Sequence, residues 1–305
     1  MKPMTKQERL GLVRLLAEVS PRDLVAEAPP LRPDLAALAG ARLPRRPRAV
    51  LFDVYGTLVM SAAGGEPNLA GDAGGQGGEG ALGLLEEELA RAGFRGGARR
   101  FAREVAGAIA ADRAERLADT PHPEVDIEGL VSRLLGEAAP ATARRAALLL
   151  EASQNPCAPM PGALELLARL RASGLRLGLV SNAQFYTPLL LEALSGRSPE
   201  ELGFEAGLQA YSFEGGIAKP AEEPFLRAAG PLLAGGLSPG EILVVGNSSA
   251  NDIAPARRLG FMAALFAGDA RSFRPTAPGS PGARPDTVLR GLDGLEAAFP
   301  PSDES

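Results

Sequence analysis

The sequence predicts an α/β fold, a doubly wound parallel sheet with a helical domain inserted after its first strand. Three observations lead to this prediction. Residues 49–56 form an apolar strand, residues 81–151 carry helical patterns without a strand, and apolar strands alternate with helices from about residue 160. Alternating strands and helices predict right-handed crossovers, and therefore a parallel sheet with helices on both faces.

Residues 1–48 are expected to be an N-terminal helical extension with a proline-rich connector. Thr5 and Glu8 have the spacing of a capping box in front of an apolar face, which predicts a short amphipathic helix. We expect this helix to pack on the domain that follows rather than to form a separate module for a partner.

Residues 61–159 are expected to comprise a glycine-rich loop and a helical cap. The loop, residues 64–80, contains eight glycines among seventeen residues, a composition that cannot support a packed core. It predicts a mobile segment, either a hinge for lid motion or an insertion without functional weight. Helix formers dominate residues 81–151.

Residues 49–60 and 160–297 are expected to form the core. Pro161 is placed in the first turn of a helix that Gly174 ends. Further strands are expected, in chain order, at LRLGLVSN, AGLQAYSF, EILVVG, FMAALFAG and DTVL. Helices are expected between consecutive strands as far as FMAALFAG.

The composition excludes several classes of protein. A net charge of −5 argues against nonspecific binding to nucleic acid or to a membrane surface. No apolar run reaches the roughly 18 residues of a membrane span, and the first residues lack the apolar core of a signal peptide. With Cys157 as the single cysteine and His122, a turn residue between two prolines, as the single histidine, a disulfide, a zinc site and a histidine triad are excluded. A cytoplasmic protein that acts on a small molecule is expected, and its oligomeric state stays open.

Lysine is rare in this chain, which draws attention to one position. Of 32 lysines and arginines, only Lys2, Lys6 and Lys219 are lysines. Lys219 is therefore the one lysine in the body of the chain. Because an ammonium group is not interchangeable with a guanidinium, Lys219 is expected to have a specific role, the alternative being that one lysine remained at this position by chance.

Polar residues gather where the predicted strands end, which is where ligands bind in such sheets. The segments are 53–57, 181–186, 211–219 and 246–252. Besides Lys219 they contain all three tyrosines and three of the five asparagines, namely Tyr55, Tyr186, Tyr211, Asn182, Asn247 and Asn251. This concentration predicts one site at the carboxyl edge of the sheet.

The segments DVYGT, SN, KP and GNSSAND, in this order, resemble the four motifs of the haloacid dehalogenase (HAD) superfamily. The resemblance covers residues 49 to about 270. Each motif alone is a weak signal, but four motifs in this order at predicted strand ends make a strong one. It implies a Rossmann-like HAD core with a helical cap between motifs one and two. SNAQFYTPLL and GNSSANDIAPARRLGF further resemble an uncharacterised branch of HAD hydrolases.

The resemblance makes Asp53 a nucleophile, and the physical chemistry of the position agrees. A carboxylate at the end of an apolar strand costs several kcal/mol unless a cation or hydrogen-bond donors compensate it. Held beside a cation, it can attack phosphorus or carbon and form a covalent intermediate. Gly56 would let the chain turn close to a ligand, and the hydroxyl of Thr57 would orient the loop.

By the same resemblance, Ser181 would donate to a transferring phosphoryl oxygen. Asn182, its neighbour, would contact the substrate or fix the geometry of the loop. Lys219 would neutralise both Asp53 and the charge that develops in the transition state.

The resemblance also implies a magnesium site, with Mg²⁺ held by hard oxygen ligands and water. The expected ligands are Asp53, the backbone carbonyl of Tyr55, Asn247 and Asp252. For Asp252 the alternative role is that of a capping acid at the start of a helix.

Two positions depart from a HAD phosphatase. Tyr55 stands where a second aspartate would protonate the leaving group, a contribution typically worth 10²–10⁴-fold, and Asn247 stands where an acid is usual. Tyrosine at this place is found in the 2-haloacid dehalogenases of the superfamily, which need no metal. Their fourth motif, Ser-Ser-Asn-x-x-Asp, is only partly matched by Asn247, Ser248 and Ser249, and their arginine and glutamine cap motifs cannot be identified in this sequence.

Three hypotheses follow from the sequence. The leading one is Mg²⁺-dependent hydrolysis of a small phosphate ester through an Asp53 intermediate. The second is metal-independent dehalogenation of a 2-haloacid, suggested by Tyr55 and Asn247. The third is a HAD-fold binding protein without catalytic activity. Nothing in the predicted cap identifies the substrate.

Overall fold

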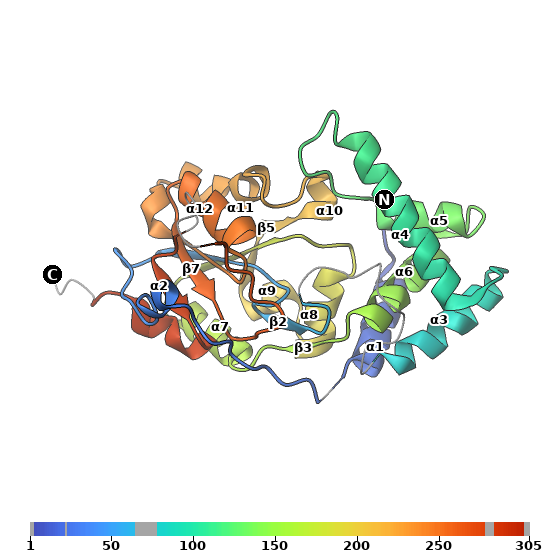
Figure 1. Cartoon of the computed structure of the whole chain (residues 1–305), viewed down its shortest axis with the longest axis horizontal. Helices are drawn as coiled ribbons and strands as arrows, with labels where there is room; N and C mark the ends of the chain where they lie inside the picture. Colours follow the sequence, from blue (N-terminus) through green and yellow to red (C-terminus); the bar gives the residue numbers. More distant parts are fainter. Residues whose placement is uncertain (1–2, 22, 65–77, 278–283, 302–305) are drawn as a thin grey trace.

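The computed structural model describes residues 3–21, 23–64, 78–277 and 284–301. A sheet of six parallel strands with helices on both faces forms its centre, which confirms the predicted fold class (Figure 1). In spatial order the strands are β5 (Phe204–Tyr211), β4 (Arg176–Ser181), β1 (Ala49–Phe52), β6 (Ile242–Gly246), β7 (Met262–Phe266) and β8 (Thr287–Leu289).

Strand β1 lies in the middle of the sheet, between β4 and β6. Because side chains of a strand alternate between the two faces, β1 contributes to two separate cores. Val50 and Phe52 belong to one apolar cluster, while Ala49 and Leu51 belong to the other. A strand buried on both sides explains its uninterrupted apolar sequence, and it leaves the residue after Phe52 at the carboxyl edge.

Helices of the core cover both faces of the sheet. On one side lie α7 (Ala163–Ala172) and α8 (Thr187–Ser195), and on the other α11 (Glu223–Ala234) and α12 (Ala254–Arg258). Shorter helices are α2 (Pro33–Ala36), α9 (Pro199–Leu202) and α10 (Ser212–Gly215), and a π-helical turn, Ser249–Ile253, leads into α12.

Between β1 and α7 the described residues form four helices, which lie at one end of the molecule, beyond the sheet (Figure 1). They are α3 (Glu79–Arg91), α4 (Gly97–Arg116), α5 (Ile127–Leu134) and α6 (Pro140–Gln154). The chain passes to and from them through two short antiparallel strands, β2 (Val59–Ser61) and β3 (Cys157–Pro159). This pair was not predictable from the sequence, because three-residue strands are too short to show a period.

The N-terminal helix α1 (Lys6–Val19) packs on α8 of the core and on inserted α6. Thr5 caps it, accepting a hydrogen bond from the Glu8 N–H at 3.1 Å. Arg144 of α6 is fully buried and pairs with Glu8 of α1 and with Glu128 of α5. The division of the chain into extension, core and cap remains a prediction, although α1 contacts both of the other parts.

Three details differ from the sequence analysis. Pro161 lies before α7, which begins at Ala163 after the N-cap Gly162, whereas Gly174 follows the helix end in a left-handed conformation as predicted. The predicted glycine-rich loop, residues 64–80, extends too far, because Gly78 is the N-cap of α3 and the helix begins at Glu79. Residues 65–77 of that stretch lie outside the described residues. Among the described residues, no helix is long and apolar enough to cross a membrane.

Candidate active site

Asp53 follows β1 at the carboxyl edge of the sheet and is buried. Its N–H continues the sheet by donating to Val245 of β6 at 2.9 Å. The Thr57 hydroxyl donates to Asp53 Oδ2 at 3.1 Å. The predicted role of Thr57 in orienting this loop therefore has a concrete contact, made directly to the acid.

Gly56 makes the turn that brings Thr57 back to Asp53, with φ at +80°. A side chain here would be strained by the left-handed backbone, and its Cβ would lie 2.3 Å from Asn247 Nδ2 and 2.5 Å from Ser272 Cβ. A side chain at this position would therefore clash with protein atoms, while the expected approach of Gly56 to a ligand stays a prediction.

Gly56→Ala is expected to lower the free energy of unfolding by about 1–3 kcal/mol, from backbone strain and overpacking. Gly83→Ala is the control, because this glycine lies within α3 with nothing within 4 Å of an added Cβ. The control is expected to gain stability, by about 0.5–1 kcal/mol. Urea unfolding of both variants measures the difference, and equal stability of the two would contradict this account of Gly56.

Lys219 lies between two carboxylates. Its Nζ donates to Asp53 Oδ1 at 2.7 Å, to Asp252 Oδ1 at 2.6 Å and to the Val180 carbonyl at 3.0 Å. An ammonium has three N–H donors, so these acceptors use all of them. Burial on its own would lower the pKa of Lys219, but the Asp252 and Asp53 carboxylates raise it above its ordinary value.

Asn182 holds the backbone of Lys219 from both sides. Its Oδ1 accepts from the Lys219 N–H at 2.7 Å, and its Nδ2 donates to the Lys219 carbonyl at 3.2 Å. Of the two roles predicted for Asn182, the structure thus supplies the contacts for fixing the loop. Ser181 is buried at the end of β4, with its Oγ 3.4 Å from the Asn182 carbonyl oxygen.

Asp252 lies in the π-helical turn after β6. Besides Lys219 it binds the Ser248 N–H, which donates to Oδ2 at 2.9 Å, so Asp252 also has the capping role that the sequence analysis left open. Burial raises the pKa of Asp252 to about 6, against the opposing effect of Lys219. Gly246 leaves room for this carboxylate, since a Cβ there would lie 2.3 Å from Asp252 Cγ.

The residues expected to bind Mg²⁺ follow β1 and β6 at this edge of the sheet, where hydrogen bonds already engage the two carboxylates. Each oxygen of Asp53 and Asp252 already accepts a hydrogen bond, and Lys219 lies between the two acids. Asn247 is neutral, and its amide nitrogen donates to the Ser272 carbonyl.

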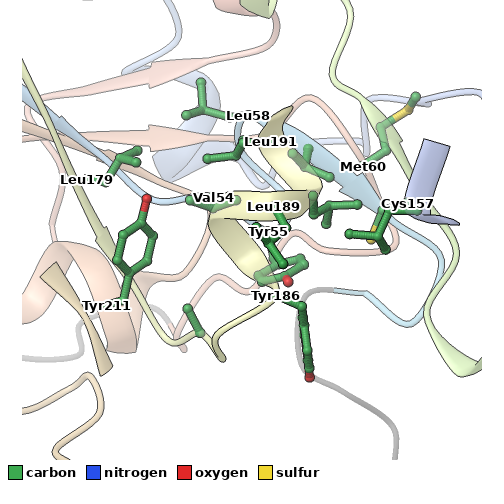
Figure 2. Close-up of a cluster of buried hydrophobic side chains, with 14 of the residues drawn as sticks. Val54, Tyr55, Leu58, Met60, Cys157, Leu179, Tyr186, Leu189, Leu191 and Tyr211 are labelled. Atoms are coloured by element: carbon green, nitrogen blue, oxygen red, sulfur yellow. The ribbon is translucent and has the colours of Figure 1, made fainter. Parts of the chain in front are cut away.

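Tyr55 is buried in an apolar cluster. Figure 2 shows it beside Tyr186 and near Leu189 of α8. Its hydroxyl lies 3.0 Å from Thr187 Oγ1 at the start of α8, and burial raises its pKa well above the ordinary value. With its pKa raised, this phenol is a weaker proton donor than a carboxyl group, so Tyr55 is a poor replacement for the acid that protonates a leaving group.

A cavity of about 420 Å³ lies between the carboxyl edge of the sheet and the inserted helices. Tyr55, Asn182 and Lys219 line it from the core, and Asp53 lies behind Lys219, to which it is hydrogen-bonded, rather than in the lining itself. Ile109 and Arg113 line it from α4, Leu117 from the C-cap of α4, Ile127 from α5, and Ala147, Leu150 and Glu151 from α6.

The segment before α5 connects the inserted helices to the loop that carries Lys219. The Glu124 N–H donates to Gly216 at 2.9 Å, and the Ala218 N–H donates to His122 at 2.8 Å. His122 has a φ of +52°, in agreement with a turn residue, and it also lines the cavity. The buried Glu124 carboxylate accepts from Ser212 Oγ at 2.6 Å.

Glu151 is a buried carboxyl on the cavity wall. It accepts hydrogen bonds from Asn155 Nδ2 at 2.9 Å and from the Tyr186 hydroxyl at 3.1 Å. Burial raises its pKa above the ordinary value. Glu151 could not be selected from the sequence, because nothing distinguishes it from the other residues of the helical segment in which it stands.

The raised pKa of Glu151 makes stability depend on pH. Between its ordinary and its raised pKa, Glu151 keeps a proton in the folded state that it loses on unfolding, so stability falls as pH rises through this window. Glu151→Gln removes this loss. The melting temperature of the variant, relative to the unmodified protein, is therefore expected to increase from pH 5 to pH 8.

The control for this prediction is Glu115→Gln, on the exposed side of α4. Its melting temperature relative to the unmodified protein should not change between the two pH values. A constant difference for Glu151→Gln as well would show that Glu151 has the same charge in the folded and unfolded states.

Comparison with known proteins agrees with the fold. The family model of haloacid dehalogenase-like hydrolases matches residues 47–260. No curated protein matches the chain in sequence.

Three solved structures are similar at low identity. A 2-haloacid dehalogenase from Pseudomonas syringae pv. Tomato DC3000 has a TM-score of 0.55 and 19% identity, covering 83% of this chain and 97% of its own. A HAD phosphatase from Thermococcus onnurineus has a TM-score of 0.46 and 20% identity, and the match covers 82% of this chain and 96% of the phosphatase. The putative HAD hydrolase YfnB from Bacillus subtilis, bound to magnesium, has a TM-score of 0.47 and 22% identity, and the match covers 82% of this chain and 97% of YfnB. The first likeness shows a common fold.

Proposed function

The chain belongs to the haloacid dehalogenase-like hydrolases, and from this membership we propose that it hydrolyses the carbon–halogen bond of a 2-haloacid through an ester on Asp53, without a metal. One observation carries the proposal. The Lys219 ammonium lies between Asp53 and Asp252 and donates all three N–H groups to protein acceptors. The cation that a nucleophilic carboxylate needs is therefore already part of the chain.

The first step is attack by an Asp53 carboxylate oxygen on the carbon that bears the halogen. A carbon–oxygen bond forms while the carbon–halogen bond breaks, and the halide leaves with the electron pair. Lys219 keeps Asp53 ionised before the attack, and Thr57 orients the carboxylate through its bond to Oδ2. Once Asp53 is a neutral ester, Lys219 still pairs with Asp252.

The second step is hydrolysis of the ester. Water attacks the Asp53 carbonyl carbon, and the ester bond to the substrate oxygen breaks. The products are a 2-hydroxy acid, the restored Asp53 carboxylate and one proton, which passes to solvent. Atoms and charge balance, because one water is consumed and one halide is released.

Arg113 is the residue we propose for binding the carboxylate of the substrate. It lines the cavity from α4, and its guanidinium is 56% exposed and 3.9 Å from Glu124, so it can form a further ion pair. The sequence could not select it, because residues 61–159 contain ten arginines with no distinguishing pattern.

Hydrolysis of a phosphate ester with Mg²⁺ is the second candidate. It is favoured by Asp53, Asp252 and Asn247, which follow β1 and β6 and supply oxygen donors of the type that Mg²⁺ prefers. When bound, the ion would polarise a phosphoryl oxygen. Two observations argue against this candidate. The carboxylate oxygens of Asp53 and Asp252 already accept hydrogen bonds, and position 55 carries a tyrosine instead of an acid.

The two candidates are separated by product release with and without a chelator. Purified protein is supplied with a panel of 2-bromoalkanoates and a panel of phosphate esters, each with EDTA or with Mg²⁺. Halide release that EDTA leaves unchanged is the expected result. Phosphate release that requires Mg²⁺, without halide release, would overturn the proposal, and no product from either panel would favour a binding protein without catalysis.

A further inference from the structure

The cavity beside Lys219 has an apolar wall that the inserted helices supply. Side chains from α4, α5 and α6 form much of it: Ile109, Ala114, Leu117, Ile127, Ala147 and Leu150. Its volume, about 420 Å³, lies within the range of pockets that enclose ligands of considerable size. An acid of two or three carbon atoms would occupy a minor part of it.

The polar side chains on the wall are mostly engaged with one another. Glu151 accepts from Tyr186, and Glu124 accepts from Gln184 at 2.9 Å. Tyr55 is bonded to Thr187, and Asn182 to Lys219. A substrate rich in hydroxyl groups would have to replace these bonds, and any group left unpaired costs affinity.

We infer that the substrate is a 2-halogenated acid with an unsubstituted alkyl chain of medium length, whose halogen-bearing carbon faces Asp53 and whose chain fills this cavity. The inference rests on the proposed function and adds to it the length and kind of the substrate's alkyl chain. The carboxylate end lies near Lys219 and Arg113, the two cationic side chains of the lining, and the hydrocarbon end contacts Ala147 and Leu150 on α6.

Chain length is then the determinant of specificity. Each methylene that enters the cavity is expected to raise kcat/KM about fourfold, until the cavity is filled. Because the chain binds equally in the ground state and the transition state, the gain appears mainly as a lower KM. The series from 2-bromopropionate to 2-bromooctanoate, assayed by bromide release, measures this slope on the unmodified protein.

A pair of variants on α6 tests the placement of the chain. Ala147→Leu adds volume inside the cavity and is expected to lower kcat/KM for 2-bromooctanoate at least tenfold, while 2-bromopropionate changes less than about twofold. Ala141→Leu makes the same change on the exposed face of α6, outside the cavity, and should alter neither value. Melting temperatures of both variants show whether they remain folded.

The outcomes distinguish this inference from the proposed function. Bromide release that is independent of chain length, or greatest for the shortest acid, would overturn the inference and leave the proposed function intact. A loss in Ala147→Leu that is equal for short and long acids would also overturn it. No bromide from any acid of the series would overturn the proposed function itself.

Discussion

Asp53→Asn is expected to abolish halide release, lowering kcat by at least about 10⁴-fold, because the amide cannot form the ester that both steps require. The side chain keeps its size and can still accept from Thr57, so the fold should be retained. Melting temperature and circular dichroism check the fold, and bromide release from 2-bromooctanoate measures the activity.

The matched control is Asp293→Asn, the same change at an exposed position outside the cavity. Its activity should equal that of the unmodified protein. If Asp53→Asn released halide at a rate close to that of the control, Asp53 would not be the nucleophile, and the account of the site would have to be abandoned.

Lys219→Met is expected to cause the second large effect, on stability as well as activity. It leaves two buried carboxylates without their cation, and removing one partner from a buried ion pair typically costs about 3–5 kcal/mol. Adding Asp252→Asn should restore part of this loss, since one of the unpaired charges is then gone. Urea unfolding of the single and double variants measures the coupling.

The effect of Lys219→Met should also depend on pH. The pKa of Asp252 is already raised to about 6 with Lys219 in place, so at pH 5 this acid takes up a proton more readily and the penalty shrinks. Lys6→Met, at an exposed lysine on α1, is the control and should change stability by less than about 0.5 kcal/mol. Equal penalties for the two lysine variants would mean that the ion pairs at Lys219 contribute nothing.

The core of the fold was predictable because its signals are local. Apolar runs such as residues 49–52 mark buried strands, and Gly174 marks the end of a helix through a backbone conformation that favours glycine. The strand pair β2 and β3 was not predictable. Its pairing joins residues almost a hundred positions apart, and neither strand is long enough to show alternation.

The polar centre of the site was predictable from the positions of its residues at strand ends. The rarity of lysine identified Lys219, and the structure places it in contact with Asp53 and Asp252. The sequence could not show which donors occupy the carboxylate oxygens of Asp53 and Asp252. That Lys219 uses all three N–H groups, and that Ser248 and Thr57 bind the remaining carboxylate oxygens, depends on the fold of three separate loops.

The substrate cavity was the least predictable part. Arg113 and Glu151 stand in helices where arginine and glutamate are frequent, so no local pattern distinguishes them from surface residues. Only the packing of α4 and α6 over the sheet edge turns these two side chains toward the cavity. The hypothesis of a magnesium phosphatase followed from motifs alone. The proposal of attack at carbon rests on the lack of an acid at position 55 and on the neutral Asn247, together with a cation, Lys219, that the chain itself supplies to Asp53.

The most direct test of the central claim, an ester between Asp53 and the substrate, is isotope labelling in water enriched in ¹⁸O. The protein is allowed many turnovers of 2-bromooctanoate with EDTA present, and the peptide that contains Asp53 is then analysed by mass spectrometry. The account predicts ¹⁸O in the Asp53 carboxylate, since water attacks its carbonyl carbon in every cycle. Product that carries ¹⁸O while Asp53 stays unlabelled would show that water attacks the substrate directly, and would contradict the account.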